Sequence, residues 1–284
     1  MRVVLITGCS SGFGLETSLA FARRGDTVVA TMRNLDKAAP LLERAAGEGL
    51  DVEVLALDVT SGDSIARCVG QLTDRHGAID VLVNNAGIAA GGAVETMDLE
   101  VAKGVLETNF WGSVRMIQAV LPAMRARSAG VVVNVSSIAA RISPPPCGSW
   151  YAVSKHAVSV LSESLCMELH GTGVRVVSIE PGFYRTEITA NTLWDSATPT
   201  DGFYAADGAW IERFFASGVR AGGDPRDVAD AIVAAAEDPA TPLHVVLPLG
   251  AEEFVLQQSA IPFEATLESR LAGYEALAGP RPTR

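Results

Sequence analysis

Short, almost entirely apolar runs alternate with amphipathic stretches along most of the chain. The stretches between the runs, such as Leu15–Arg24, Leu35–Ala46 and Pro225–Glu237, carry apolar residues at helical spacing. Continuous apolar strands separated by helices are typical of a parallel sheet that is buried on both faces. The pattern predicts strands at Arg2–Thr7, Thr27–Thr31, Val52–Leu57, Val81–Asn84, Val131–Val135, Val174–Ile179 and Leu243–Leu247.

Strands of this kind, joined by right-handed helical crossovers, predict an α/β fold with a doubly wound, seven-stranded parallel sheet and helices on both faces. No linker or repeat divides the chain, so we expect one domain over residues 1–284, in which the C-terminal segment Glu252–Leu277 is helical. Residues 187–223 interrupt the alternation and form an aromatic-rich insertion after a strand end, where a substrate lid is expected. The alternative is that its aromatic side chains pack extra helices onto the core; they are Trp194, Phe203, Tyr204, Trp210, Phe214 and Phe215.

Charge and composition limit the kinds of partner and the cellular location that we expect for the protein. The net charge of −11, from 22 basic and 33 acidic residues, argues against nucleic acid or an anionic membrane as the main partner. No apolar run is long enough to span a membrane, and the first residues lack a signal-peptide cleavage site, so we expect a cytoplasmic protein. The cysteines and histidines show no metal-ligand spacing, so we predict no metal site.

A glycine-rich turn follows the first predicted strand and opens the first helix. It reads Thr7-Gly8-Cys9-Ser10-Ser11-Gly12-Phe13-Gly14. Glycine permits a tight turn and a close approach to a pyrophosphate, and the free N–H groups of the helix N-terminus attract its charge. The turn therefore predicts a dinucleotide site, with a glycine turn that binds no ligand as the alternative.

The second strand indicates which dinucleotide is preferred. In such sites an acidic residue about 20 positions after the glycines binds the ribose 2′-hydroxyl, whereas an arginine accommodates a 2′-phosphate. Here the strand runs into Met32-Arg33-Asn34, with no acidic residue. We therefore favour NADP over NAD, although Arg33 could also be an ordinary solvated charge.

A tyrosine and a lysine four residues apart lie on a further predicted helix, Tyr151–Leu169. Positions i and i+4 share one helix face, so Tyr151 and Lys155 can reach the same pocket. A nearby cation favours the phenolate, which suits acid–base chemistry. By itself the pair could equally be a surface feature of an amphipathic helix.

Taken together, these motifs resemble the classical short-chain dehydrogenase/reductase family, and its hydroxysteroid- and retinol-dehydrogenase-like branch in particular. The resemblance extends from Val3 to Thr186. Besides the glycine turn and Tyr151-x-x-x-Lys155, it rests on Asp58-Val59, Asn84-Asn85-Ala86-Gly87, Asn109, Ser137, Pro181-Gly182 and Thr186.

The resemblance implies a Rossmann fold and an NADP-dependent oxidoreductase. The expected reaction transfers a hydride between the nicotinamide and a carbonyl or secondary alcohol of a moderately hydrophobic small molecule, in a homodimer or homotetramer. Tyr151 would exchange the proton, Lys155 would lower the pKa of Tyr151 and bind the ribose, Ser137 would hold the substrate oxygen, and Asn109 would anchor a water. The cofactor residues would be Gly8, Ser10, Ser11, Gly12, Phe13, Gly14, Arg33, Asp58, Val59, Asn85, Ala86, Gly87, Tyr151, Lys155, Pro181, Gly182 and Thr186.

One departure and three rival functions stay open. The family usually places its catalytic serine one position closer to the tyrosine, so we assume a one-residue insertion in the proline loop, Pro144–Pro146, and keep Ser136 as the alternative to Ser137. An NADP-binding isomerase or dehydratase, or a cofactor-sensing protein without chemistry, could use the same scaffold. An S-adenosylmethionine-dependent methyltransferase shares the sheet but would not need the tyrosine–lysine pair.

Overall fold

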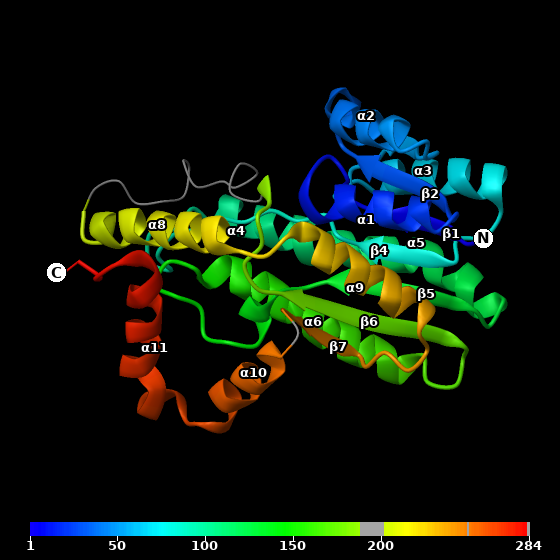
Figure 1. The fold of residues 1–284 in the computed structure, drawn as a ribbon. Helices are drawn as coiled ribbons and strands as arrows, with labels where there is room; N and C mark the ends of the chain where they lie inside the picture. The colour runs from blue at the N-terminus through cyan, green and yellow to red at the C-terminus, as the bar shows by residue number, and fades with distance from the viewer. Residues whose placement is uncertain (188–201, 249, 283–284) are drawn as a thin grey trace.

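The predicted sheet is confirmed. The computed structural model describes residues 1–187, 202–248 and 250–282 (Figure 1). Its seven strands form one sheet in the order β3-β2-β1-β4-β5-β6-β7, and every neighbouring pair is parallel. The strands are β1 (Val3–Ile6), β2 (Thr27–Met32), β3 (Glu53–Ala56), β4 (Val81–Asn84), β5 (Gly130–Val135), β6 (Val174–Pro181) and β7 (His244–Leu247).

Successive side chains of each strand point to opposite faces of the sheet, and each face has its own apolar core. In β1, Val4 and Ile6 belong to one buried cluster, whereas Leu5 between them belongs to the other. Both faces therefore need apolar residues, which explains why the strands are apolar throughout instead of alternating with polar residues.

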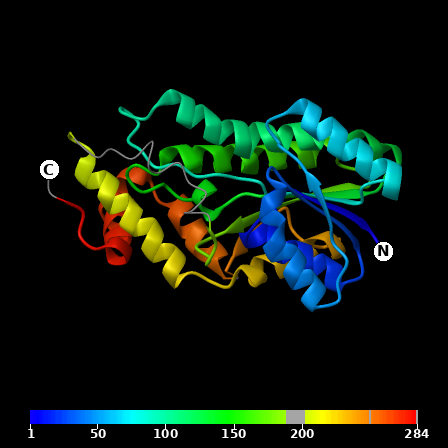
Figure 2. The ribbon, with the colours of Figure 1, turned by 90° about the horizontal axis from the view of Figure 1, so that it is seen from above.

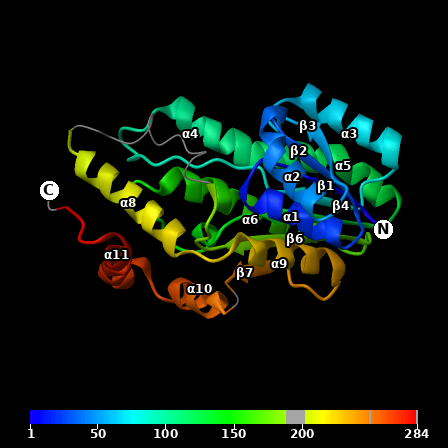
Figure 3. The same cartoon turned by 45° about the horizontal axis from the view of Figure 1, so that its top comes forward.

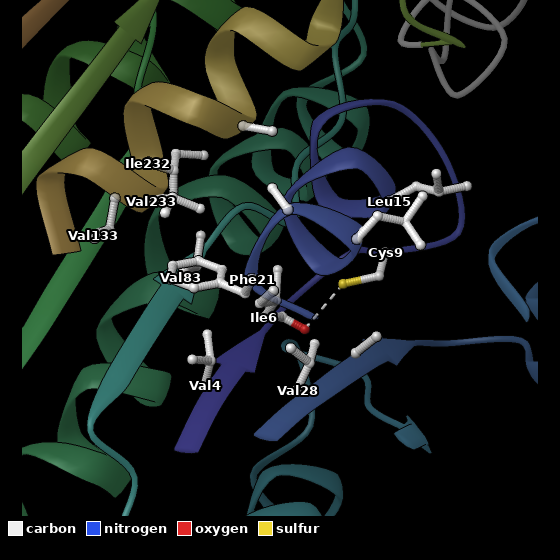
Figure 4. Packing of buried hydrophobic residues seen from close by; sticks show 14 of the residues in the cluster. Val4, Ile6, Cys9, Leu15, Phe21, Val28, Val83, Val133, Ile232 and Val233 are labelled. Atoms are coloured by element: carbon white, nitrogen blue, oxygen red, sulfur yellow. Dashed lines mark hydrogen bonds between the residues drawn. The ribbon is translucent and has the colours of Figure 1, made fainter. Parts of the chain in front are cut away.

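Helices cover both faces (Figure 2). The first core lies under α1 (Gly12–Arg23), α2 (Ala39–Gly47) and α9 (Pro225–Glu237). Figure 4 shows side chains of this core, with Val4, Val28, Val83 and Val133 on the strands facing Phe21 and Ile232 on the helices. The second core lies under α3 (Gly62–His76), α5 (Gly112–Ala126) and α6 (Ser149–Glu168). The shorter elements are η1 (Leu35–Ala38), α4 (Leu99–Leu106), η2 (Glu107–Trp111) and η3 (Ile138–Ala140).

The segment Glu252–Leu277, predicted to be helical, is helical except for a break near its middle. The segment forms two helices, α10 (Ala251–Ala260) and α11 (Phe263–Ala278). The break falls at Ile261, whose backbone is extended, directly before Pro262. A proline ring clashes with a helical residue before it and has no N–H to donate, so the helix cannot continue through this point.

The aromatic insertion contributes α8 (Ala205–Ala221), which packs against α11 at the end of the molecule where the C-terminus lies (Figure 1). Trp210 is fully buried, and its indole N–H donates to the Gly279 carbonyl oxygen at 2.9 Å. Phe214 meets the Tyr274 ring edge-on, with 5.4 Å between ring centres. These aromatic side chains thus join helices to each other, as the alternative interpretation expected. Trp194 and the rest of residues 188–201 lie outside the described residues, so the lid over 187–223 stays a prediction.

Within the described residues, no helix is both long and apolar enough to cross a membrane.

Candidate functional site

One cavity lies along the edge of the sheet where the strands end. In a parallel sheet all carboxyl ends meet at one edge, so segments far apart in the sequence converge there. The cavity has a volume of about 640 Å³. Most of the predicted cofactor residues line it, namely Gly8, Ser10, Ser11, Gly12, Phe13, Arg33, Asp58, Val59, Asn85, Ala86, Gly87, Tyr151, Lys155 and Thr186.

The glycine turn leaves the N-terminus of α1 open toward this cavity. Gly8 and Gly12 have φ of +74° and +56°, a left-handed conformation that side chains with a Cβ rarely adopt. Ser11 is the N-cap residue, but its side chain makes no capping hydrogen bond, and the first turn of α1 contains no acidic residue. The first N–H groups of the helix are therefore available to an anion, as binding of a dinucleotide phosphate requires.

The loop after β4 holds the glycine turn in place. The Asn85 side chain donates to the carbonyl oxygens of Thr7 at 2.8 Å and Gly8 at 3.0 Å. In return, the Thr7 hydroxyl oxygen accepts the backbone N–H groups of Asn85 and Ala86. Asn85 was predicted to be a cofactor residue, and its side-chain amide stabilises the shape of the glycine turn.

Two cations lie at the other end of the cavity, near the ends of β2 and β3. Arg33 was predicted, whereas Lys37 in η1 was missed, although both residues line the cavity wall. Both are exposed, and within the described residues neither makes an ion pair with an acidic side chain. The signal that could have found Lys37 is its position about one helical turn after Arg33.

Lys155 lies on the buried side of α6, with only 5% of its surface exposed. Its ammonium group donates to the Val135 carbonyl oxygen at 2.8 Å and lies 5.8 Å from the centre of the Tyr151 ring. Burial disfavours the charged amine and lowers the pKa of Lys155 to about 8. The pair predicted from its spacing is therefore brought together at the cavity.

The pKa of Tyr151 is raised, mainly because burial disfavours the phenolate, while a hydrogen bond with Ser137 partly opposes this rise. The lowering of the Tyr151 pKa expected from Lys155 is not found. The Lys155 ammonium group donates to the Val135 carbonyl oxygen. Tyr151 is consequently protonated at neutral pH, which suits a group that donates a proton.

The two candidate serines differ in position and partners: Ser136 belongs to the cavity lining, whereas Ser137 does not. Ser137 forms the hydrogen bond with Tyr151 and lies next to Pro181, whose carbonyl oxygen accepts its hydroxyl at 3.3 Å. The Ser136 hydroxyl points into the protein instead, where it donates to the Lys155 carbonyl oxygen at 2.8 Å and bonds the Ser159 hydroxyl.

Asn109 lies in η2, a single wide turn of π-helix between α4 and α5. Such turns are frequent at functional sites. Its amide oxygen accepts the Ile88 backbone N–H at 2.8 Å, and its amide nitrogen donates to Ile88 and to the Ser154 hydroxyl. A Cβ on Gly87 would lie 3.4 Å from the Asn109 amide oxygen and 3.5 Å from the Lys155 nitrogen, so Asn109 and Lys155 flank this glycine.

Some predicted residues lie behind the cavity wall: Gly14, Asn109, Ser137, Pro181 and Gly182 are not part of its lining. Gly182 donates its N–H to Leu247 of β7 at 2.8 Å. Besides Lys37, the cavity lining contains residues that were not predicted: Met32, Asn34, Leu57, Ile88, Gly104, Thr108, Val135 and Glu187.

Comparisons with known proteins agree with this geometry. The family model for short chain dehydrogenases matches residues 2–196. An uncharacterized oxidoreductase, YusZ, of Bacillus subtilis is 37% identical over 81% of this chain and 83% of its own length. Retinol dehydrogenase 8 of Bos taurus is 41% identical over 69% of this chain, which spans 64% of that relative. A 3-ketodihydrosphingosine reductase of Bacteroides thetaiotaomicron is 36% identical over 72% of both chains.

Solved structures show the same fold. A short-chain dehydrogenase from Streptomyces avermitilis superposes with a TM-score of 0.79 at 31% identity, over 97% of this chain and 96% of that one. A short chain dehydrogenase/reductase from Burkholderia phymatum, in complex with NAD, reaches a TM-score of 0.80 at 25% identity over 95% of each chain. The sheet order, the glycine turn, the Tyr151–Lys155 pair and these matches lead to one conclusion: the chain belongs to the classical short-chain dehydrogenase/reductase family, near its retinol-dehydrogenase-like members.

Proposed function

We propose that this protein is an NADP-dependent oxidoreductase that interconverts a carbonyl and a secondary alcohol on a moderately hydrophobic small molecule. The observation that carries the proposal is that Tyr151 and Lys155 line a cavity that also contains the glycine turn and two exposed cations, Arg33 and Lys37, which form no ion pair within the described residues. Two relatives are named for hydrophobic compounds that carry an alcohol or a carbonyl: retinol, which is a primary alcohol, and 3-ketodihydrosphingosine, which is a ketone.

The residues present fit a nicotinamide dinucleotide, because an open helix N-terminus faces a cavity long enough to reach from Arg33 to Tyr151. The bound cofactor would supply or accept the hydride. The glycine turn would bind the pyrophosphate, and Lys155 would donate to the ribose hydroxyls. Asp58 and Val59, at the end of β3, would border the adenine.

Tyr151 would donate its phenolic proton to the carbonyl oxygen during reduction and take it back during oxidation. Its raised pKa keeps that proton in place at neutral pH. Ser137, hydrogen-bonded to Tyr151, would donate to the same oxygen as negative charge develops on it. Buried Asn109 would fix the Ile88 segment beside Lys155.

The preference for NADP rests on Arg33 and Lys37. A 2′-phosphate carries close to two negative charges and would give both unpaired cations a partner. A ribose 2′-hydroxyl would instead leave them without one. Among solved relatives, a metagenomic short-chain oxidoreductase at 26% identity was crystallised with NADP, whereas the Burkholderia phymatum protein was crystallised with NAD, so this chain's own residues must decide.

We also propose assembly into homodimers or homotetramers through the outer face of α6. Val153 and Val160 are seven positions apart, hence on one helix stripe, and each has 48% of its surface exposed. Light scattering of Val153→Glu should show a smaller particle than the wild type, and an unchanged mass would place any interface elsewhere.

The test of function follows NADPH oxidation at neutral pH over steroid, retinoid, aromatic and aliphatic carbonyls, with NADH in parallel. Turnover that prefers NADPH and disappears in Tyr151→Phe supports the proposal. Binding of NADPH without turnover on any carbonyl would favour an isomerase, a dehydratase or a cofactor-sensing protein. If neither nucleotide binds, the proposal fails.

A further inference from the structure

A fully buried carboxylate lies directly beneath the proposed site. Glu180, in β6, has 0% of its side chain exposed and immediately precedes Pro181. One carboxylate oxygen accepts the Arg141 side chain at 2.8 Å. The other accepts the hydroxyls of Ser159 at 3.0 Å and Ser178 at 3.1 Å, and bonds the His244 ring at 2.8 Å. This carboxylate therefore links four side chains that are far apart in the sequence.

Two of these links lead to the proposed catalytic groups. Ser159 lies one turn after Lys155 on α6, and its hydroxyl bonds that of Ser136 at 2.9 Å. Ser136 in turn donates to the Lys155 carbonyl oxygen, which joins the end of β5 to the helix that carries Tyr151. Arg141 ends η3, and the N-cap of this short helix is Ser137. The Glu180 carboxylate thus contacts both the segment from Ser137 to Arg141, called the Ser137 loop below, and helix α6, which carries Tyr151 and Lys155.

A buried carboxylate is costly at this position, the last but one residue of β6. Burying a carboxylate carries a desolvation penalty, which its ion pairs offset only with good geometry and further hydrogen bonds. Here Arg141 and His244 outweigh burial and hold the pKa of Glu180 below its usual value, so the group is charged at neutral pH. An apolar side chain would fill this strand position with less desolvation, so stability alone does not account for the carboxylate.

We propose that Glu180 is a positioning residue, which through Ser159 and Ser136 fixes α6 relative to the Ser137 loop and so sets the approach of Tyr151 and Ser137 to the substrate oxygen. The catalytic part of this inference rests on the proposed oxidoreductase function, whereas the anchoring of α6 does not. Displacing a catalytic group by about 1 Å can cost about 100-fold in rate, so weakening the anchor lowers turnover.

Two serines that donate to the same carboxylate oxygen provide a matched comparison. Ser159 is on α6 and leads to Ser136, whereas Ser178 is on β6 and does not. Both hydroxyls are buried, so removing either one should destabilise the protein to a similar extent. We expect Ser159→Ala to lower kcat about tenfold with little change in the Kd for NADPH, and Ser178→Ala to leave kcat within about twofold of the wild type.

A second pair of variants, at Glu180 and Asp26, tests whether the effect on kcat is specific to Glu180 or follows from the loss of any buried ion pair. Asp26 directly precedes β2, at the side of the sheet where the strands begin. Its side chain is 5% exposed and pairs with Arg2, whose side chain is 26% exposed. Arg141, the partner of Glu180, is also 26% exposed. Glu180→Gln should lower kcat more than Ser159→Ala does, whereas Asp26→Asn should lower the melting temperature without lowering kcat.

Backbone amide exchange of the Tyr151–Ser159 segment, read in all variants without substrate, completes the test. We expect exchange about tenfold faster in Ser159→Ala and Glu180→Gln than in Ser178→Ala and Asp26→Asn. Equal exchange and equal kcat in the two serine variants would overturn the inference. If the wild type reduces no carbonyl but the exchange rates differ, the proposed function fails while the anchoring of α6 stands.

Discussion

The two halves of the sheet contribute different kinds of groups to the site at the edge where the strands end (Figure 3). Around β1, β2 and β3, the site consists of glycines, backbone N–H groups and the exposed cations Arg33 and Lys37. Around β5, β6 and β7, it consists of buried side chains bonded to one another, with Glu180 and Lys155 almost entirely shielded from water. The first half is suited to binding a charged ligand, and the second to holding reactive groups in fixed positions.

If this division is correct, substitutions in the second half should change turnover and those in the first should change cofactor binding. Tyr151→Phe should show the largest effect. Loss of a general acid costs about 100- to 10,000-fold, so kcat should fall within that range while the Kd for NADPH, measured by fluorescence, changes less than about threefold. Thr73→Val, which removes a hydroxyl that donates to Val69 within α3 and lies outside the cavity lining, is the control and should keep its activity. Substantial turnover in Tyr151→Phe would contradict the assignment.

Reversing the charge of Arg33 or Lys37, in the first half of the sheet, should have a smaller effect on activity, confined to the preference between NADPH and NADH. Arg33→Asp and Lys37→Glu should each lower the preference for NADPH over NADH about tenfold or more, because a charge-assisted contact to phosphate is lost. The preference is measured as the ratio of kcat/KM for the two cofactors. Arg67→Asp on α3 changes the net charge equally but lies outside the cavity lining, and should leave the ratio unchanged. The same unchanged ratio in Lys37→Glu would remove Lys37 from the site.

The pH dependence of stability should reveal the buried amine of Lys155 in the second half of the sheet. The pKa of Lys155 is about 8 in the folded protein, below the 10.5 of an ordinary lysine. Between these values the unfolded chain binds more protons than the folded one, so this residue makes stability rise with pH in that window. Below pH 8 the wild type bears the full cost of burying the charge, on the order of 3 kcal/mol.

Lys155→Met removes the amine and with it this dependence. Denaturant unfolding at pH 7 and pH 10 should therefore show that the stability of the wild type relative to Lys155→Met improves as the pH rises. A difference that does not change with pH would mean that Lys155 titrates normally.

Local sequence patterns predicted the sheet and the glycine turn of the first half well, because both depend on short segments. A buried parallel strand needs an apolar run, and a phosphate-binding turn needs glycines at a strand–helix junction, so each leaves a contiguous signal. Pro262 was also visible, and a stricter reading of it would have predicted the break between α10 and α11. For Lys37 the only local signal is its position four residues after Arg33, and a surface lysine at that spacing resembles any other until η1 brings it to the cavity.

The sequence by itself therefore determined the fold, the family resemblance and the residue types of the catalytic pair, because spacing along one strand or helix fixes them. Only the tertiary structure decided that Ser137 contacts Tyr151, that burial raises the pKa of Tyr151, and that Glu180 meets Arg141, Ser159 and His244. Burial and long-range hydrogen bonds depend on how distant segments pack together, and no spacing within a single segment encodes them.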